Sequence, residues 1–166
     1  MIFEGGPSGK EQSMNSSESL KTFLKGKKQR DDETGRVADK EERILSRRSA
    51  IEELFASIQG WLKSSVDEGI VSIERDVYVL SDEQLGVLAE ESMKLIVGVS
   101  EVFFAPVGGS LAGASARVDM VSGDRRLPIV LLPDRGWHFL VRGPVTRTEL
   151  VTEESFGDAL KELLDE

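Results

Sequence analysis

The segment Leu127–Gly143, LPIVLLPDRGWHFLVRG, decides the fold of this chain. Two apolar runs flank the turn Pro-Asp-Arg-Gly, in which Pro133 presets φ and Gly136 can adopt a positive φ. The two runs are therefore predicted to pair as a β-hairpin. Side chains of the return strand alternate between a core face with Trp137, Phe139 and Val141 and an outer face with His138, Leu140 and Arg142.

Three further segments show the alternation of β-strands. The first is Ile70–Leu80, with Val71, Ile73, Val77 and Val79 on one face, and the second is Lys94–Phe104. The third is Ala114–Val121, with Ala114, Ala116, Val118 and Met120 inward. The turn Ser122-Gly-Asp should lead the third segment into the hairpin. On the third segment, Arg117 and Asp119 point outward, where an exposed ion pair is expected.

Lys94–Phe104 and the outgoing strand of the hairpin are apolar on both faces, so each needs cover on two sides. The residues expected on the second face form a candidate protein interface: Ile96, Val102, Phe104, Val130, Leu132, His138 and Leu140. A partner protein or a second copy of the chain would cover this patch. The alternative is that the two helices of the chain cover both faces.

Helix signals flank these strands. Asp39 and Glu42 form an N-cap pattern that predicts an amphipathic helix over Lys40–Ser65, which ends before Gly69. Three arginines, Arg43, Arg47 and Arg48, lie near its start and oppose the helix dipole, so this turn is expected to project beyond the core. Thr152 caps a C-terminal helix whose buried stripe is Phe156, Leu160, Leu163 and Leu164.

The segment after the first strand is ambiguous. Ser81 and Gln84 match a capping box, which predicts a short helix over Asp82–Glu91, whereas Gly86-Val-Leu-Ala is equally compatible with a strand. The chain is thus predicted to be α+β, with a long N-terminal amphipathic helix, an antiparallel β-meander of four to five strands and a short C-terminal helix. Residues 1–38 are expected to form a disordered, basic-leaning arm and residues 39–166 a single domain.

Charge is unevenly distributed along the chain, whose net charge is −9. Residues 1–48 carry 11 Lys and Arg against 9 Asp and Glu, and the remaining residues carry 10 against 21. An acidic domain repels phosphate backbones and favours a basic partner, so only the arm could contact nucleic acid.

Few residues suit catalysis or metal binding. The chain has no cysteine and one histidine, His138, which excludes disulfides, thiolate zinc sites and two-histidine metal sites within one chain. Two glycine-rich segments, Gly5–Lys10 and Gly108–Gly113, lack the spacing and the strand-to-helix context of nucleotide-binding loops. No cofactor and no metal are therefore expected.

These observations predict a non-enzymatic protein-binding accessory factor, of the adaptor, immunity-type or chaperone-like kind, that acts through an acidic surface and an apolar sheet face. One alternative is a nucleic-acid-associated protein whose basic residues contact phosphates: Lys21, Lys25, Lys27, Lys28, Arg30, Arg43, Arg47 and Arg48. A second alternative is a small hydrolase-like enzyme centred on His138, with Ser115 and Asp119 as candidate partners. A cytoplasmic location without a membrane span is expected, and a homodimer is possible.

Overall fold

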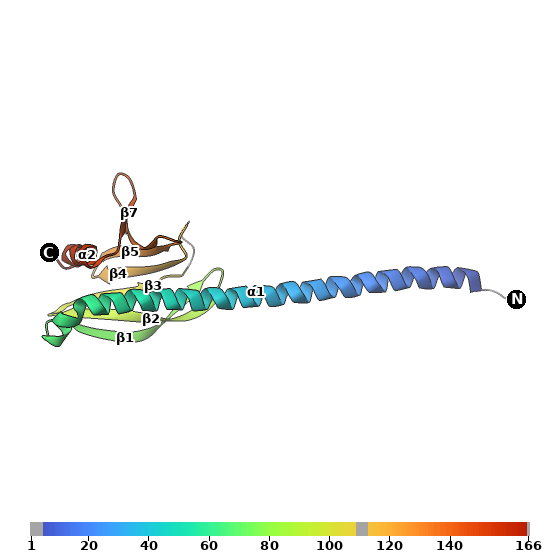
Figure 1. Cartoon of the computed structure of the whole chain (residues 1–166), viewed down its shortest axis with the longest axis horizontal. Coiled ribbons are helices and arrows are strands. Elements are labelled where there is room, and N and C mark those ends of the chain that lie inside the picture. The colour runs from blue at the N-terminus through green and yellow to red at the C-terminus, as the bar shows by residue number, and fades with distance from the viewer. Residues whose placement is uncertain (1–4, 109–112, 166) are drawn as a thin grey trace. The chain divides into compact units, whose positions relative to one another are not determined.

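The computed structural model describes residues 5–108 and 113–165, and of residues 5–16 the backbone alone. Most side chains of the glycine-rich segments Gly5–Lys10 and Gly108–Gly113 are therefore not among those that the structure describes. The chain divides into two compact units, Met1–Arg43 and Ile44–Glu166. One helix of 63 residues, α1 (Gly5–Asp67), begins in the first unit and ends in the second (Figure 1).

Residues 5–43 are helical, whereas composition predicted disorder for residues 1–38, and the predicted helix start at Asp39 is wrong because α1 runs through it. Opposite charges four residues apart support the helix here: Lys27 Nζ lies 3.1 Å from Asp31 Oδ2, and Lys28 Nζ lies 3.0 Å from Asp32 Oδ2. An N-cap pattern marks a helix start only if the preceding residues are not helical themselves. From residue 17 to residue 43, every residue apart from Gly26 is exposed.

The second unit contains one antiparallel sheet of seven strands in the order of the sequence, so the predicted meander is confirmed (Figure 1). The strands are β1 (Ser72–Asp82), β2 (Gly86–Val97), β3 (Ser100–Pro106), β4 (Ala116–Ser122), β5 (Arg125–Leu132), β6 (Gly136–Val141) and β7 (Arg147–Leu150). The hairpin of β5 and β6 forms as predicted, with Asp134 and Gly136 at positive φ in its turn. The short strand β7 was not predicted.

Asp82–Glu91 is not a helix, and the strand alternative is correct. The Asp82 carboxylate accepts hydrogen bonds from the backbone N–H groups of Gln84 and Leu85, both at 2.8 Å, and so closes the turn between β1 and β2. An aspartate bonds the following N–H groups in the same way at a helix N-terminus and in an Asx-turn. The capping pattern was therefore a real local signal of a tight turn.

Lys94–Phe104 is not one strand but two, because Gly98, at a φ of 61°, turns the chain between β2 and β3. The two-residue loop Gly98-Val99 reverses the direction, so Leu95 pairs with Val102 and Met93 with Phe104 on the same face. The continuous alternation assumed for this segment was wrong, and Val102 and Phe104 belong to the core face rather than to the second face.

Both helices contribute to one core on this face of the sheet. The Phe104 ring lies 6.3 Å from that of Phe55 on α1 and 6.2 Å from that of Phe156 on α2 (Glu153–Leu164). The core also contains the predicted inward residues Ala116, Val118, Met120 and Phe139. Thr152 caps α2 as predicted, since its hydroxyl accepts from the Ser155 N–H and its own N–H donates to the Ser155 Oγ. Trp61 packs on Phe156 and joins the C-terminal part of α1 to α2.

Candidate functional site

Three valines near the tip of the β1–β2 hairpin are exposed on the face of the hairpin that carries Ile73 and Leu95. Val77 and Val79 on β1 are each 65% exposed, and Val87 on β2 is 75% exposed. The register sets them side by side, because Val79 pairs with Ala89, Val77 with Glu91, and Ser81 with Val87. We call Val77, Val79, Val87 and Ala89 the valine patch.

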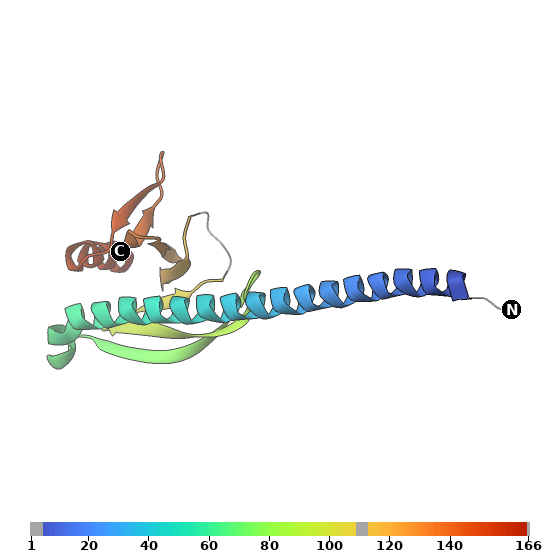
Figure 2. The same ribbon diagram turned by 45° about the vertical axis from the view of Figure 1, so that its right-hand side comes forward.

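The valine patch is exposed because the hairpin twists along α1 (Figures 1 and 2). Ile44 of α1 packs against Leu80, Leu85 and Leu88, and Leu80 and Leu88 alternate onto the hairpin face opposite the valines. Two-stranded ribbons twist more strongly than wide sheets, which allows one helix to contact both faces of this hairpin. The helix consequently leaves the valines uncovered.

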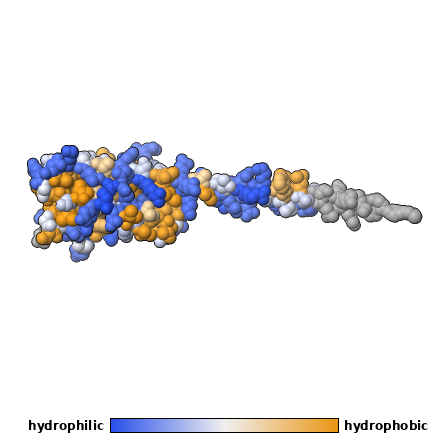
Figure 3. Space-filling model, turned by 90° about the horizontal axis from the view of Figure 1, so that it is seen from below, coloured by the Kyte–Doolittle hydropathy of each residue, from blue (hydrophilic) through white to orange (hydrophobic). Residues whose placement is uncertain are grey.

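A groove of about 630 Å³ lies between α1 and the valine patch. One wall is formed by Arg48, Ser49, Ile51 and Glu52 of α1, and the other by Val77, Ala89, Glu90 and Glu91 of the hairpin. Leu45, one helical turn before Ser49 on the same side of α1, is 64% exposed. Figure 3, seen from the side on which β1 lies, shows exposed apolar surface among charged side chains on this unit.

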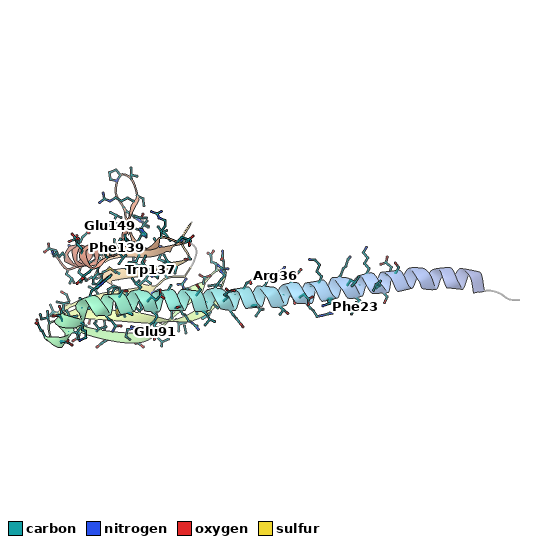
Figure 4. The ribbon with its side chains drawn as sticks, viewed as in Figure 1. Phe23, Arg36, Glu91, Trp137, Phe139 and Glu149 are labelled. Carbon is teal, nitrogen blue, oxygen red and sulfur yellow. The ribbon has the colours of Figure 1, made fainter. Side chains whose placement is uncertain are left out.

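Arg75 bonds Glu52 and Glu91, which line the groove, and holds α1 against the hairpin. Its guanidinium donates to Gln59 Oε1 at 2.6 Å, to Glu52 Oε2 at 2.5 Å and to Glu91, and it lies 5.0 Å from the centre of the Phe55 ring. Hydrogen bonding with Glu52, together with the hydrogen bond from Arg75, lowers the pKa of Glu91 (labelled in Figure 4). Glu91 thus keeps its negative charge at the groove.

Arg47 and Glu90 form a second, buried link between α1 and the hairpin. Arg47 Nε donates to Glu90 Oε1 at 2.9 Å, and its other guanidinium nitrogen donates to the Val107 carbonyl at 2.6 Å. Burial raises the pKa of Glu90, against the opposing effect of Arg47. The prediction that the Arg43–Arg48 turn projects beyond the core is therefore wrong for Arg47, which is 6% exposed.

The residues of the predicted sheet-face interface do not form one patch. Val102 and Phe104 are fully buried in the core, and Val130 and His138 are 1% and 7% exposed on the outer face. Ile96, Leu132 and Leu140 remain half-buried on that outer face. Sequence reasoning missed the valine patch because Val77 and Val79 share the alternation of Ile73, and alternation does not show which part of a strand a helix covers.

The predicted nucleic-acid residues are divided by the structure. Lys27 and Lys28 pair with aspartates, Arg47 with Glu90, and Arg48 donates to the Ala89 carbonyl at 3.2 Å. The remaining four, Lys21, Lys25, Arg30 and Arg43, lie on α1 within the first unit. The acidic residues Asp31, Asp32 and Glu33 directly follow Arg30, so no continuous basic stripe forms. The helix surface also exposes Leu20, Phe23 and Leu24, of which Figure 4 labels Phe23.

Within the described part of the chain, His138 forms no hydrogen bond with its candidate catalytic partners Ser115 and Asp119. Its Nδ1 lies 3.0 Å from the Gly136 carbonyl, and its cross-strand neighbours are Val130 and Leu150. Asp119 is fully buried and bonded to Arg117 and Arg126, which corrects the expected exposed pair, and Ser115 Oγ donates to the Leu131 carbonyl.

No group of three or more histidine and carboxylate side chains that could hold a metal ion occurs within residues 5–108 and 113–165. No helix in the same ranges has the length and apolar character needed to cross a bilayer. The chain matches no protein-family model, no curated protein and no solved structure. Its function is therefore inferred from its own geometry.

Proposed function

We propose that this chain is a non-enzymatic protein-binding module, adaptor-like or chaperone-like, whose groove between α1 and the β1–β2 hairpin holds a basic amphipathic helix of a partner protein. The observation that carries the proposal is the valine patch. Isolated exposed apolar residues are common on monomeric proteins, but three adjacent valines at 65%, 65% and 75% exposure form a contiguous apolar surface beside a groove.

The shape of the site favours a helix as the occupant. Helices pack on sheets in layers, and here α1 and α2 cover the core of this unit but leave the valine patch exposed. A third helix lying beside α1 would complete this layer and would contact Leu45 on one side and the valines on the other. Amphipathic helices bind hydrophobic grooves in this manner with apolar anchors three and four residues apart.

Charge favours a basic partner. The unit Ile44–Glu166 carries 12 Lys and Arg against 21 Asp and Glu. A negative surface of this kind attracts a lysine-rich segment and raises its rate of association, with a strong dependence on ionic strength. Glu52 and Glu91 at the groove place part of this charge where the flanks of the bound helix would lie.

Binding of a designed helical peptide to the full chain tests the proposal. The peptide repeats leucine at three- and four-residue steps and flanks this stripe with lysines, and a matched peptide replaces the lysines with glutamates. We expect the lysine peptide to bind and the glutamate peptide to bind at least tenfold more weakly by isothermal titration calorimetry, a difference of about 1.4 kcal/mol.

Isosteric variants locate the binding site. The triple variant Val77→Thr, Val79→Thr, Val87→Thr keeps β-branched side chains, so the strands should form while the apolar patch is lost. We expect at least a tenfold loss of affinity for the lysine peptide. Val99→Thr, in the exposed β2–β3 turn, is the matched control and should bind as the wild type does. Equal binding of both peptides, or wild-type binding by the triple variant, would contradict the proposal.

A further inference from the structure

A second cleft, separate from the groove, lies between the β5–β6 region of the sheet and α2. Its volume is about 490 Å³, within the usual range of small-molecule sites. It lies where the pairing of β5 with β6 ends at Ile129 and Phe139, next to Pro128, which has no N–H to donate across the strands. Apolar residues also line it, among them Leu127, Phe139 and Leu140.

One wall of the cleft is cationic. The buried carboxylate of Asp119 accepts from Arg117 Nε at 2.7 Å and from Arg126 at 2.6 Å, so one negative charge is shared between two guanidinium groups. The Asp119 hydrogen bonds raise the pKa of Arg117, which keeps this guanidinium charged. Arg142 also lines the cleft and forms no ion pair with any described residue. This wall therefore has an excess of positive charge.

Three carboxylates also line the cleft. Asp158 and Glu162 lie four residues apart on the same side of α2, and Glu149 projects from β7, close to Phe139 on the neighbouring strand (Figure 4). None of the three carboxylates forms an ion pair within the described chain. The cleft is thus lined by charges of both signs that do not neutralise each other, which suits a ligand that carries both charges.

We infer that this cleft binds a short zwitterionic ligand of the amino-acid or peptide kind, whose carboxylate and ammonium groups are separated by an apolar stem. The carboxylate would contact Arg142 and the arginines held by Asp119, in the forked geometry that guanidinium groups offer to carboxylates. The ammonium group would contact Asp158 and Glu162. The stem would lie on the half-buried Leu140, where burial of methylene groups favours binding.

Three probes of nearly equal length test the inference on the full chain. They are 6-aminohexanoate, which carries both charges, hexanoate, which lacks the ammonium group, and hexylammonium, which lacks the carboxylate. Titration calorimetry at low ionic strength should show that 6-aminohexanoate binds at least tenfold more tightly than either single-charge probe. Equal affinity for all three, or no binding of 6-aminohexanoate at millimolar concentration, would overturn the inference.

Two variants test which residues contact the carboxylate and the ammonium group of 6-aminohexanoate. Arg142→Gln should weaken 6-aminohexanoate several-fold and leave hexylammonium unchanged, whereas Asp158→Asn should weaken 6-aminohexanoate and leave hexanoate unchanged. Both residues are exposed, so the variants should fold. Arg135→Gln and Glu153→Gln, which do not line the cleft, are the matched controls. Losses in the controls equal to those in the cleft variants would also overturn the inference. The lysine-peptide experiment on the groove is independent of this result.

Discussion

The Arg47 guanidinium and the Glu90 carboxylate form an ion pair in the interior of the folded unit, where their side chains are 5% and 1% exposed. The pair ties α1 to β2, and the additional hydrogen bond from Arg47 to Val107 extends the link to the residue after β3. The second oxygen of Glu90 is buried and has no hydrogen-bond partner among the described residues. The hydrogen bonding of the two partners therefore differs. Arg47 donates to two acceptors, whereas only one oxygen of the Glu90 carboxylate accepts a hydrogen bond.

Removal of Arg47 should be much more harmful than neutralisation of Glu90. Arg47→Gln leaves the Glu90 charge buried without its hydrogen-bonded cation, and we expect the free energy of unfolding to fall by about 3 kcal/mol. Glu90→Gln keeps an acceptor for Arg47 Nε and removes a charge that burial disfavours, so its loss should be clearly smaller. Urea denaturation at neutral pH measures the free energy of unfolding of both variants. Equal losses in the two variants would contradict the prediction.

The same carboxylate should make stability depend on pH. Because the pKa of Glu90 is raised above its usual 4.5 in the folded state, the folded protein binds more protons than the unfolded chain between that value and the raised pKa. Its contribution to stability is therefore fully present below pH 4.5 and is lost as the pH rises through the raised pKa. We expect the stability of the wild type relative to Glu90→Gln to increase on acidification from neutral pH, measured by denaturation of both proteins in parallel.

Gly108 should not tolerate a side chain. A Cβ atom at this position would lie 2.0 Å from the Ser81 carbonyl oxygen and 2.8 Å from its carbon, so backbone would have to move. Gly108→Ala should lower the free energy of unfolding by about 2 kcal/mol. Gly60→Ala is the matched control, because a Cβ atom added there would meet no other atom within 4 Å and alanine favours the helix; it should stabilise by up to about 1 kcal/mol. Thermal denaturation of both variants gives the comparison.

Two adjacent phenylalanines on β3 should differ in their contribution to stability. Phe104→Ala removes a ring packed between Phe55 and Phe156 and should cost about 3 to 5 kcal/mol. Phe103→Ala removes a half-buried ring on the other face that contacts Tyr78, and it should cost about 1 kcal/mol. A result in which Phe103→Ala is the more harmful would be incompatible with the face assignment of β3.

Deletion of residues 1–36 should leave the folded unit intact. From residue 17 to residue 36, every residue apart from Gly26 is exposed, so the free energy of unfolding should change by less than about 0.5 kcal/mol. The far-UV circular dichroism signal of helix per molecule should fall, because the deleted residues of α1 are helical. A large drop in the unfolding temperature would show that these residues support the fold.

Local chemistry in the sequence predicted several elements correctly. The turn with Pro133 and Gly136, the inward residues of β4 and the Thr152 cap each depend on neighbours within a few positions, and each is confirmed. The segment around Gly98 was misassigned because uninterrupted apolar character conceals a two-residue turn. The capping pattern at Asp82 was detected but assigned to a helix instead of a turn, because the same hydrogen-bond pattern occurs in turns and at helix starts.

The candidate sites, in contrast, depend on distant residues. The Arg47–Glu90 pair joins positions 43 residues apart, and the cleft brings Arg142 near Asp158 only after β7 and α2 have formed. The sequence by itself determined the α+β class, the meander and the acidic charge of the folded unit, because these follow from periodicity, turn residues and composition. Only the tertiary structure decided which apolar residues stay exposed, because the twist of the β1–β2 hairpin along α1 turns Val77 and Val79 away from the core.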